Sequence, residues 1–192
     1  MTTAPARPPP GAFLQATPQG EAALLEDVRG YVQGASHVVD LFAGCGTFAL
    51  PLAEGARVHA VEGDKAMTQA LDHGWRHAQG LRHVTTEARD LFRNPLLPQE
   101  LARFDAAVID PPRAGAEAQV AQLCEARIPR IAFVSCNPVT FARDAAALLR
   151  AVVVRERRAT FSVAPGQPPR PPTRTGVPGL FLAGDWIDTG LP

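Results

Sequence analysis

Short apolar segments alternate with amphipathic segments along most of this chain, and this alternation constrains its fold more strongly than any other feature. Strands are expected over residues 37–42, 57–61, 84–88, 106–109 and 130–135. Helices are expected over residues 20–33, 47–54, 67–78, 116–126 and 141–149. Such alternation produces a parallel sheet with helices on both faces, because strand–helix–strand crossovers are right-handed. We therefore expect an α/β fold with a doubly wound, mostly parallel sheet.

The chain divides into three segments of different character. Residues 1–12 are rich in Pro and are expected to be a disordered leader, whereas residues 13–150 carry the alternating pattern of one domain. Residues 151–192 form a Pro-rich tail, in which the six prolines of residues 165–178 exclude a regular element. Two stretches of this tail, 152–163 and 180–183, have strand character, so the tail is expected to supply the last two strands of the sheet.

The amino-acid composition and charge exclude several classes of protein. The formal net charge is zero, with 19 basic and 19 acidic residues and no block of one sign, so no general nucleic-acid-binding surface is indicated. The 3 cysteines are too few and too scattered for a disulfide framework or a zinc site. No apolar run reaches the ~18 residues of a membrane span. We expect a cytoplasmic protein without a metal site or a membrane segment.

Chemically capable residues follow the expected strands at the points where they end. In open α/β sheets, ligands bind beyond the carboxyl ends of the strands. These positions hold a glycine turn after residues 37–42, and then Glu62, Asp90, Asp110 and Cys136. Three carboxylates and one thiol are therefore expected to converge on one edge of the sheet.

The glycine turn, Gly44-Cys45-Gly46, lets the backbone approach a ligand closely. Together with Ala49 it satisfies the dinucleotide pattern G-x-G-x-x-A, so NAD is one candidate ligand. Asp40 favours S-adenosylmethionine instead, because an acid before the turn suits a cationic sulfonium and amino group and repels a pyrophosphate.

Two further acids suit the other parts of such a ligand. Glu62 is expected to accept both hydroxyl groups of a ribose, which serves NAD and S-adenosylmethionine equally. Asp90 is expected to accept a hydrogen bond from an adenine amine.

Two loops carry the most specific signals. In Asp110-Pro111-Pro112-Arg113 the prolines stiffen the exit from a strand, which indicates a rigid acceptor edge for a flat base or amide. In Ser135-Cys136-Asn137-Pro138 the thiol lies between a strand and a helix, whose amino end favours an anion. We expect Cys136 to be a nucleophile and the other two cysteines to be packing residues.

These segments together resemble the catalytic domain of the RNA (uracil-C5-)methyltransferases, which make 5-methyluridine in 23S ribosomal RNA and in tRNA. The resemblance rests on residues 13–15, 40–48, 61–63, 110–115 and 134–138. It implies a Rossmann-like class I methyltransferase fold, an RNA substrate and S-adenosylmethionine as cofactor. It also implies that Cys136 is the nucleophile and that the cofactor pocket is lined by Gln15, Phe42, Thr47, Glu62, Asp90 and Asp110, beside Asp40, Gly44 and Gly46. Thr47 departs mildly from the family, which often has Asn there.

The resemblance is incomplete in three respects. The family's N-terminal RNA-binding barrel, its central domain and the iron–sulfur cysteines of some members have no match. The family's C-terminal general base also has no match, since Glu156 is the only Glu after Cys136. We therefore expect a truncated and impaired methyltransferase. The alternatives are a noncatalytic cofactor-binding or RNA-associated relic and, less favoured, an NAD-linked oxidoreductase.

The tail has a resemblance of its own. Residues 157–161, 171–174, 180–186 and 189–192 resemble the end of squalene-associated, FAD-dependent oxidoreductases. The glycine-rich nucleotide loop of those enzymes has no match, so flavin binding is not expected, and the tail is interpreted as foreign. Because methyltransferase sheets of this class end in an antiparallel pair, residues 152–163 and 180–183 are expected to form that pair.

Overall fold

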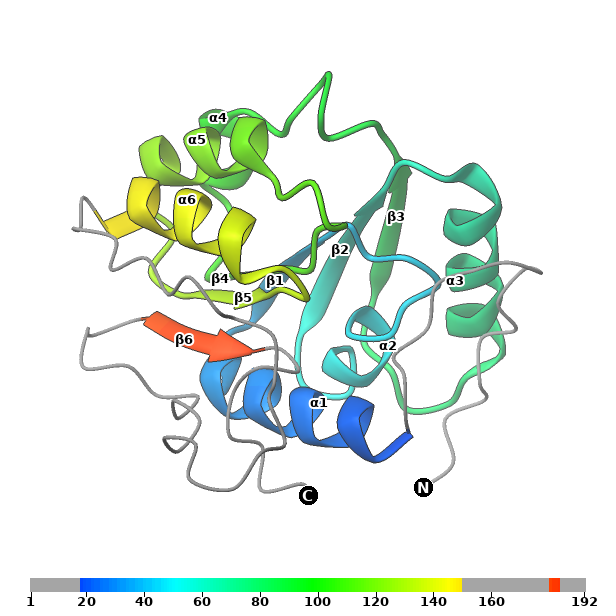
Figure 1. The fold of residues 1–192 in the computed structure, drawn as a ribbon. Coiled ribbons are helices and arrows are strands. Elements are labelled where there is room, and N and C mark those ends of the chain that lie inside the picture. The colour runs from blue at the N-terminus through cyan, green and yellow to red at the C-terminus, as the bar shows by residue number, and fades with distance from the viewer. Residues whose placement is uncertain (1–17, 150–179, 184–192) are drawn as a thin grey trace, which may run out of the picture.

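The computed structural model describes residues 18–149 and 180–183 (Figure 1). Its strands are β1 (His37–Leu41), β2 (Arg57–Glu62), β3 (Val84–Ala88), β4 (Ala106–Ile109), β5 (Ile131–Val134) and β6 (Leu180–Ala183). Its helices are α1 (Pro18–Val32), α2 (Ala49–Leu52), α3 (Lys65–His77), α4 (Pro98–Leu101), α5 (Glu117–Ala126) and α6 (Pro138–Leu149). None of the helices in these ranges is long and apolar enough to cross a membrane.

The strands form one sheet in the order β3-β2-β1-β4-β5-β6, and every neighbouring pair is parallel. The chain first builds the sheet outward from β1 to β3 and then returns to the other side of β1 with β4. This reversal confirms the expected doubly wound sheet and opens a crevice at the carboxyl ends of β1 and β4, where ligands bind in such sheets.

The two faces of the sheet are covered by different helices, as Figure 1 shows. Side chains alternate between the faces along each strand, so Val38 packs with α1, α2 and α3, whereas Val39 packs with α4, α5 and α6. The two resulting cores hold nearly all the large buried apolar side chains. Their burial on both sides explains why the central strands read as continuous apolar runs.

Local chemistry accounts for the helix boundaries. Asp64 caps α3, because its Oδ1 accepts from the backbone N–H groups of Ala66 and Met67. Pro51 is tolerated in α2 because it lies in the first turn, where no intrahelical donor is needed. The sequence pattern did not predict α4, which has four residues and is too short to show a helical period.

One of the two strands expected from the tail is described. Residues 180–183 form β6, which runs parallel to β5, with Ile131 opposite Leu180 and Val134 opposite Ala183. The pairing of this strand with residues 152–163 is not tested, so the expected antiparallel pair stays a prediction. A parallel neighbour needs a crossover of about a dozen residues or more, and residues 150–179 provide that length. The other expected strand, residues 152–163, and the leader, residues 1–12, lie outside the described residues.

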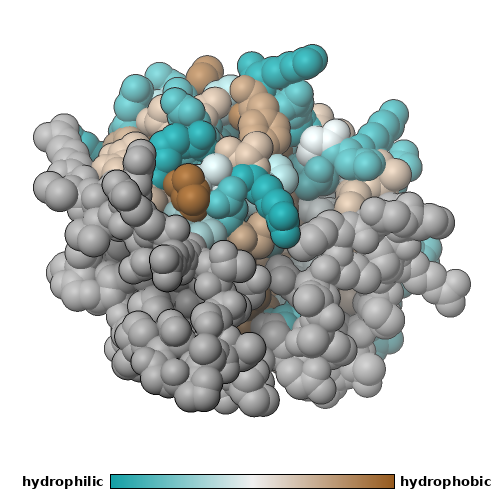
Figure 2. Space-filling view, viewed as in Figure 1, coloured by the Kyte–Doolittle hydropathy of each residue, from teal (hydrophilic) through white to brown (hydrophobic). Residues whose placement is uncertain are grey.

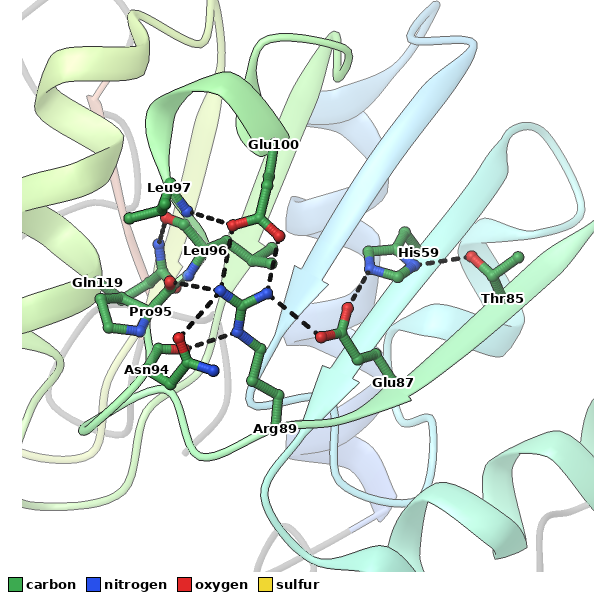
Figure 3. A network of polar contacts seen from close by, with 10 residues as sticks. All are labelled: His59, Thr85, Glu87, Arg89, Asn94, Pro95, Leu96, Leu97, Glu100 and Gln119. Atoms are coloured by element: carbon green, nitrogen blue, oxygen red, sulfur yellow. Dashed lines mark hydrogen bonds and ion pairs between the residues drawn. The ribbon is translucent and has the colours of Figure 1, made fainter.

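A polar network ties the end of β3 to α4 and α5 (Figure 3). The guanidinium group of Arg89 donates to Glu100 at 2.8 and 3.1 Å and to the carbonyl oxygens of Asn94 and Pro95 at 2.7 and 2.8 Å. On its other side it meets Glu87, which contacts the buried ring of His59. The network therefore holds the loop that carries Asp90.

Replacing Arg89 with methionine should lower the free energy of unfolding by about 2–3 kcal/mol, because it leaves Glu100 and two carbonyl oxygens without their donor. Arg76→Met is the matched control. Its exposed ion pair with Asp72, one helical turn away, should contribute much less to stability than the Arg89 network. Urea unfolding of both variants measures the difference, and equal losses would contradict the structural role of Arg89.

Candidate functional site at the carboxyl edge of the sheet

The loop after β1 has an unusual backbone. Phe42, Gly44 and Gly46 have φ values of +62°, +55° and +102°. A Cβ atom at Gly46 would lie 3.0 Å from the side chains of Leu50 and Leu71, so this position has no room for a larger residue. Phe42 is not a glycine, and a non-glycine residue in this region stores strain that is typical of functional sites. The loop therefore keeps a tight backbone surface at the crevice.

Glu62 and Gly44 lie together, as the strand ends predicted. One carboxylate oxygen of Glu62 accepts from the backbone N–H of Gly44 at 2.9 Å, and the other accepts from the N–H of Asp64 at 2.9 Å. The carboxylate is half-buried and joins the ends of β1 and β2. It is held in place by backbone donors and keeps further acceptor capacity for a ligand hydroxyl.

Asp40 is the most unusual group in the site. It is 0% exposed, and neither of its carboxylate oxygens has a hydrogen-bond partner among the described residues. Burial raises the pKa of this carboxyl well above its usual range, and the charges of Asp110 and Glu62 raise it further. The backbone N–H of Ala49 lowers this pKa, although it does not have the geometry of a hydrogen bond to the Asp40 carboxylate. A buried carboxylate without a partner is costly, so this position suits a ligand that brings positive charge.

Asp110 follows β4 and is a second, half-buried acid at this edge. Its backbone N–H donates to the carbonyl oxygen of Leu41 at 3.3 Å, which places it beside the end of β1. Burial raises the pKa of its carboxyl to about 7. Asp40, Glu62 and Asp110 thus form an acidic cluster that is unsuited to an anionic ligand.

Asp90 lies at the neighbouring end of β3 and is already engaged. Its Oδ1 accepts from the backbone N–H groups of Phe92 and Arg93, at 2.9 and 3.3 Å, and so caps a turn. The turn presents the ring of Phe92, which is 47% exposed and lies 5.4 Å from the ring of Phe42. The sequence analysis missed Phe92. Its exposure beside the glycine loop adds an aromatic wall to the site.

Cys136 lies in the loop that joins β5 to α6, and it is exposed. The residues on either side are held, since the backbone N–H of Asn137 donates to Ser135 Oγ and the N–H of Val139 donates to Asn137 Oδ1. Cys45, by contrast, is buried, and burial raises the pKa of its thiol. Only Cys136 thus combines exposure with a place at the ligand-binding edge.

Thr47 and Gln15 are the other two residues expected to line the cofactor pocket. Thr47 lies half-buried between the glycine turn and α2. Gln15 falls outside the described residues. Within residues 18–149 and 180–183, no group of three or more His, Cys, Asp or Glu side chains could hold a metal ion. Figure 2 shows hydrophilic and hydrophobic residues interspersed on the described part of this face. Val139, three residues after Cys136, is 70% exposed.

Similar proteins in the curated collections are RNA methyltransferases. An uncharacterized RNA methyltransferase of Rhizobium meliloti is 57% identical over 144 residues, which are 75% of this chain and 35% of the relative. The 23S rRNA (uracil(1939)-C(5))-methyltransferase of Halomonas elongata is 39% identical over 160 residues, 78% of this chain and 33% of the relative. The chain spans about a third of the length of these relatives.

Similar solved structures have the same Rossmann-like methyltransferase fold. The tRNA (uracil-54, C5)-methyltransferase of Pyrococcus abyssi, in complex with S-adenosyl-L-homocysteine, has a TM-score of 0.64 and 27% identity, over 73% of this chain and 34% of that one. The 16S rRNA N2 G1207 methyltransferase of T. thermophilus, in complex with AdoMet and guanosine, has a TM-score of 0.56 and 29% identity, over 74% and 41%. The family model described as tRNA (uracil-5-)-methyltransferase matches residues 7–165, most of the chain. The chain therefore belongs to the tRNA (uracil-5-)-methyltransferase family.

Proposed function

We propose that this chain binds S-adenosylmethionine at the carboxyl edge of its sheet and methylates C5 of a uridine in RNA through a covalent bond to Cys136. The observation that carries the proposal is the buried, unpartnered carboxylate of Asp40, set with Asp110 and Glu62 at the sheet edge that also carries the exposed Cys136. The RNA substrate is supported by the family and by the names of the similar proteins.

The residues at this edge fit the parts of such a cofactor. Asp40 and Asp110 would face its cationic sulfonium and amino groups, and Glu62 would accept from the ribose hydroxyls. Phe42 and Phe92 would flank a flat ring, and Gly46 leaves the backbone close to the ligand. A pyrophosphate would meet the same acids. This disfavours NAD, although the glycine pattern alone permits it.

The cofactor supplies an electrophilic methyl group, and the protein must make uracil C5 nucleophilic. The Cys136 thiolate would add to C6, so that a C6–S bond forms and the ring becomes an enolate. Through C5 this enolate would take the methyl group, whose bond to the sulfonium sulfur breaks, and S-adenosylhomocysteine is left. A base then removes the C5 proton, and the electron pair of that C–H bond restores the double bond as the C6–S bond breaks. Exposure of Cys136 at the sheet edge meets the first requirement of this sequence.

The base for the last step is unassigned, and we propose that release of the thiol is slow in this chain. After Cys136 the sequence offers one Glu, Glu156, within the run Arg155-Glu156-Arg157-Arg158. A lost general base typically costs ~10²–10⁴-fold in rate.

A substrate with fluorine at C5 separates the steps, because fluorine cannot be removed as a proton and the reaction stops after methyl transfer. RNA containing 5-fluorouridine should therefore yield a methylated covalent adduct detectable by mass spectrometry. No adduct at saturating RNA and S-adenosylmethionine would favour the noncatalytic relic.

The assignment of Glu62 can be tested by binding alone. Glu62→Ala should weaken S-adenosylhomocysteine binding by about 1–3 kcal/mol, the range for losing a charge-assisted hydrogen bond. Glu54→Ala is the control, because Glu54 pairs with Arg29 on the outer surface, before the start of β2. Isothermal titration calorimetry of both variants gives the comparison. An unchanged affinity in Glu62→Ala would remove this residue from the site.

A further inference from the structure

The loop between β4 and α5 is fastened to the first half of α6 by side chains that the proposed chemistry does not use. Asn137 Nδ2 donates to the carbonyl oxygen of Arg113 at 2.9 Å, and Thr140 Oγ1 lies 3.2 Å from the same oxygen. Arg143 donates to the carbonyl oxygen of Ala114 at 3.2 Å. Asp144 accepts from the backbone N–H of Ala116 at 2.7 Å. Three backbone sites of one loop, on Arg113, Ala114 and Ala116, are thus bound by side chains of α6 and of the residue before it.

The spacing of these four residues explains how one helix can do this. Asn137, Thr140 and Asp144 are separated by three and four positions, so they share one face of the helix, and Arg143 lies beside them. Asp144 is 1% exposed and is satisfied by the amide of Ala116 and by Arg143 Nε at 2.7 Å. A buried carboxylate is retained at a cost, and here its partners lie in the loop and on its own helix. We call these four residues the α6 clamp.

The loop itself is shaped to fit the α6 clamp. Gly115 has a φ of +81°, and a Cβ atom there would lie 2.5 Å from Arg143 Nη2 and 2.6 Å from Asp144 Oδ2. Pro111 and Pro112 have no backbone N–H, so the start of the loop offers no donor. The loop is anchored further along, through the carbonyl oxygens of Arg113 and Ala114 and the N–H of Ala116.

The α6 clamp connects the two ends of the site. Asp110 begins the loop that the clamp holds, and Cys136 immediately precedes the first clamp residue, Asn137. We propose that the α6 clamp sets the position of the Cys136 loop relative to Asp110, and so orients the nucleophile against the bound pyrimidine and the methyl donor. Its members are positioning residues, and this inference rests on the proposed function above.

Two substitutions remove the contacts with Arg113 without adding charge. Asn137→Ser keeps an oxygen that can cap α6, because Ser caps helices about as well as Asn, but it is too short to reach the Arg113 carbonyl. Thr140→Val is isosteric and removes the hydroxyl donor, whereas Thr140→Ser restores it. Both Asn137→Ser and Thr140→Val should slow adduct formation with 5-fluorouridine RNA by about tenfold or more, since a misplacement of ~1 Å can cost ~10²-fold. The rate of adduct formation by Thr140→Ser should stay within about threefold of that of the unmodified chain, a difference smaller than the tenfold effect of the other two variants.

Three further readouts separate positioning from stability. The S-adenosylhomocysteine affinity, the half-saturating RNA concentration and the melting temperature should change little in the two slow variants. Hydrogen–deuterium exchange should rise at the amides of Gly115 and Ala116, a readout that does not depend on any methyltransferase activity. If the unmodified chain forms no adduct, the proposed function fails. The α6 clamp is still tested in that case, because unchanged hydrogen–deuterium exchange at Gly115 and Ala116 in the variants would overturn it. Adduct formation at the original rate in both variants, or a loss matched by equal loss of cofactor binding and stability, would overturn it as well.

Discussion

Replacing Cys136 with alanine is expected to abolish the covalent adduct with 5-fluorouridine RNA, lowering its rate of formation by about 10³-fold or more, as removal of a nucleophile does. The reason is that no other exposed thiol is found among the described residues: Cys45 is buried and Cys124 is partly buried on α5. S-adenosylhomocysteine affinity should remain close to that of the unmodified chain, because Cys136 is not among the residues proposed to hold the cofactor. Denaturing gel analysis with peptide mass spectrometry measures both the yield and the attachment site.

Cys124→Ala is the matched control for this experiment and should form the adduct at the original rate. An adduct that persists in Cys136→Ala, or that maps to another residue, would show that the exposed thiol after β5 is not the nucleophile. It would leave the cofactor site untouched, since that site rests on separate residues.

Replacing Asp110 with asparagine is expected to stabilise the protein at high pH while it impairs methyl transfer. The pKa of Asp110 is raised to about 7 by burial, whereas the unfolded chain has the ordinary value of 3.8. Between these two values the folded state holds a proton that the unfolded state has lost, so stability decreases as pH rises through this window and is constant above it. Asparagine does not titrate, so the stability advantage of Asp110→Asn should grow by about 2–3 kcal/mol between pH 5 and pH 8.

Urea unfolding at several pH values measures this difference, because the other titrating groups are shared by the two proteins and largely cancel, apart from Asp40, whose pKa the charge of Asp110 raises. Asp105→Asn provides a control of opposite sign. The pKa of Asp105 is lowered, chiefly by the hydroxyl and backbone donors of Ser36, so its loss should destabilise the protein above the unfolded pKa. If the difference in the free energy of unfolding between Asp110→Asn and the unmodified chain does not change with pH, this would contradict the raised pKa of the Asp110 carboxyl. The expected gain in stability with loss of function is typical of a residue kept for its chemistry.

The sequence predicted those parts of the fold that leave a periodic trace. Strands β1 to β5 and the larger helices were expected at nearly their observed positions, because each buries a regular apolar pattern. Helix α4 was missed because four residues show no period. The apolar residues Leu180–Ala183 predicted a strand but not its direction relative to β5. The length of the preceding connection, rather than the strand itself, permits the parallel arrangement.

The candidate site divides in the same way. Asp40, Glu62 and Asp110 could be predicted to converge, because topology alone brings strand ends together. The loss of every hydrogen-bond partner at Asp40 could not be predicted, since it depends on the packing around one side chain. The contact between Asn137 and Arg113 joins residues from different loops and leaves no periodic signal. The same holds for the ring of Phe92, which reaches the site only through the turn that Asp90 caps.

Calorimetric titration tests most directly whether the acidic cluster at the end of β1 is an S-adenosylmethionine site. The chain should release or absorb heat on titration with S-adenosylhomocysteine, with saturable one-to-one binding that Glu62→Ala weakens. Under the same conditions NAD should give no saturable heat, because its pyrophosphate would face Asp40, Glu62 and Asp110. Saturable binding of NAD, or no binding of S-adenosylhomocysteine to a folded chain, would contradict the account.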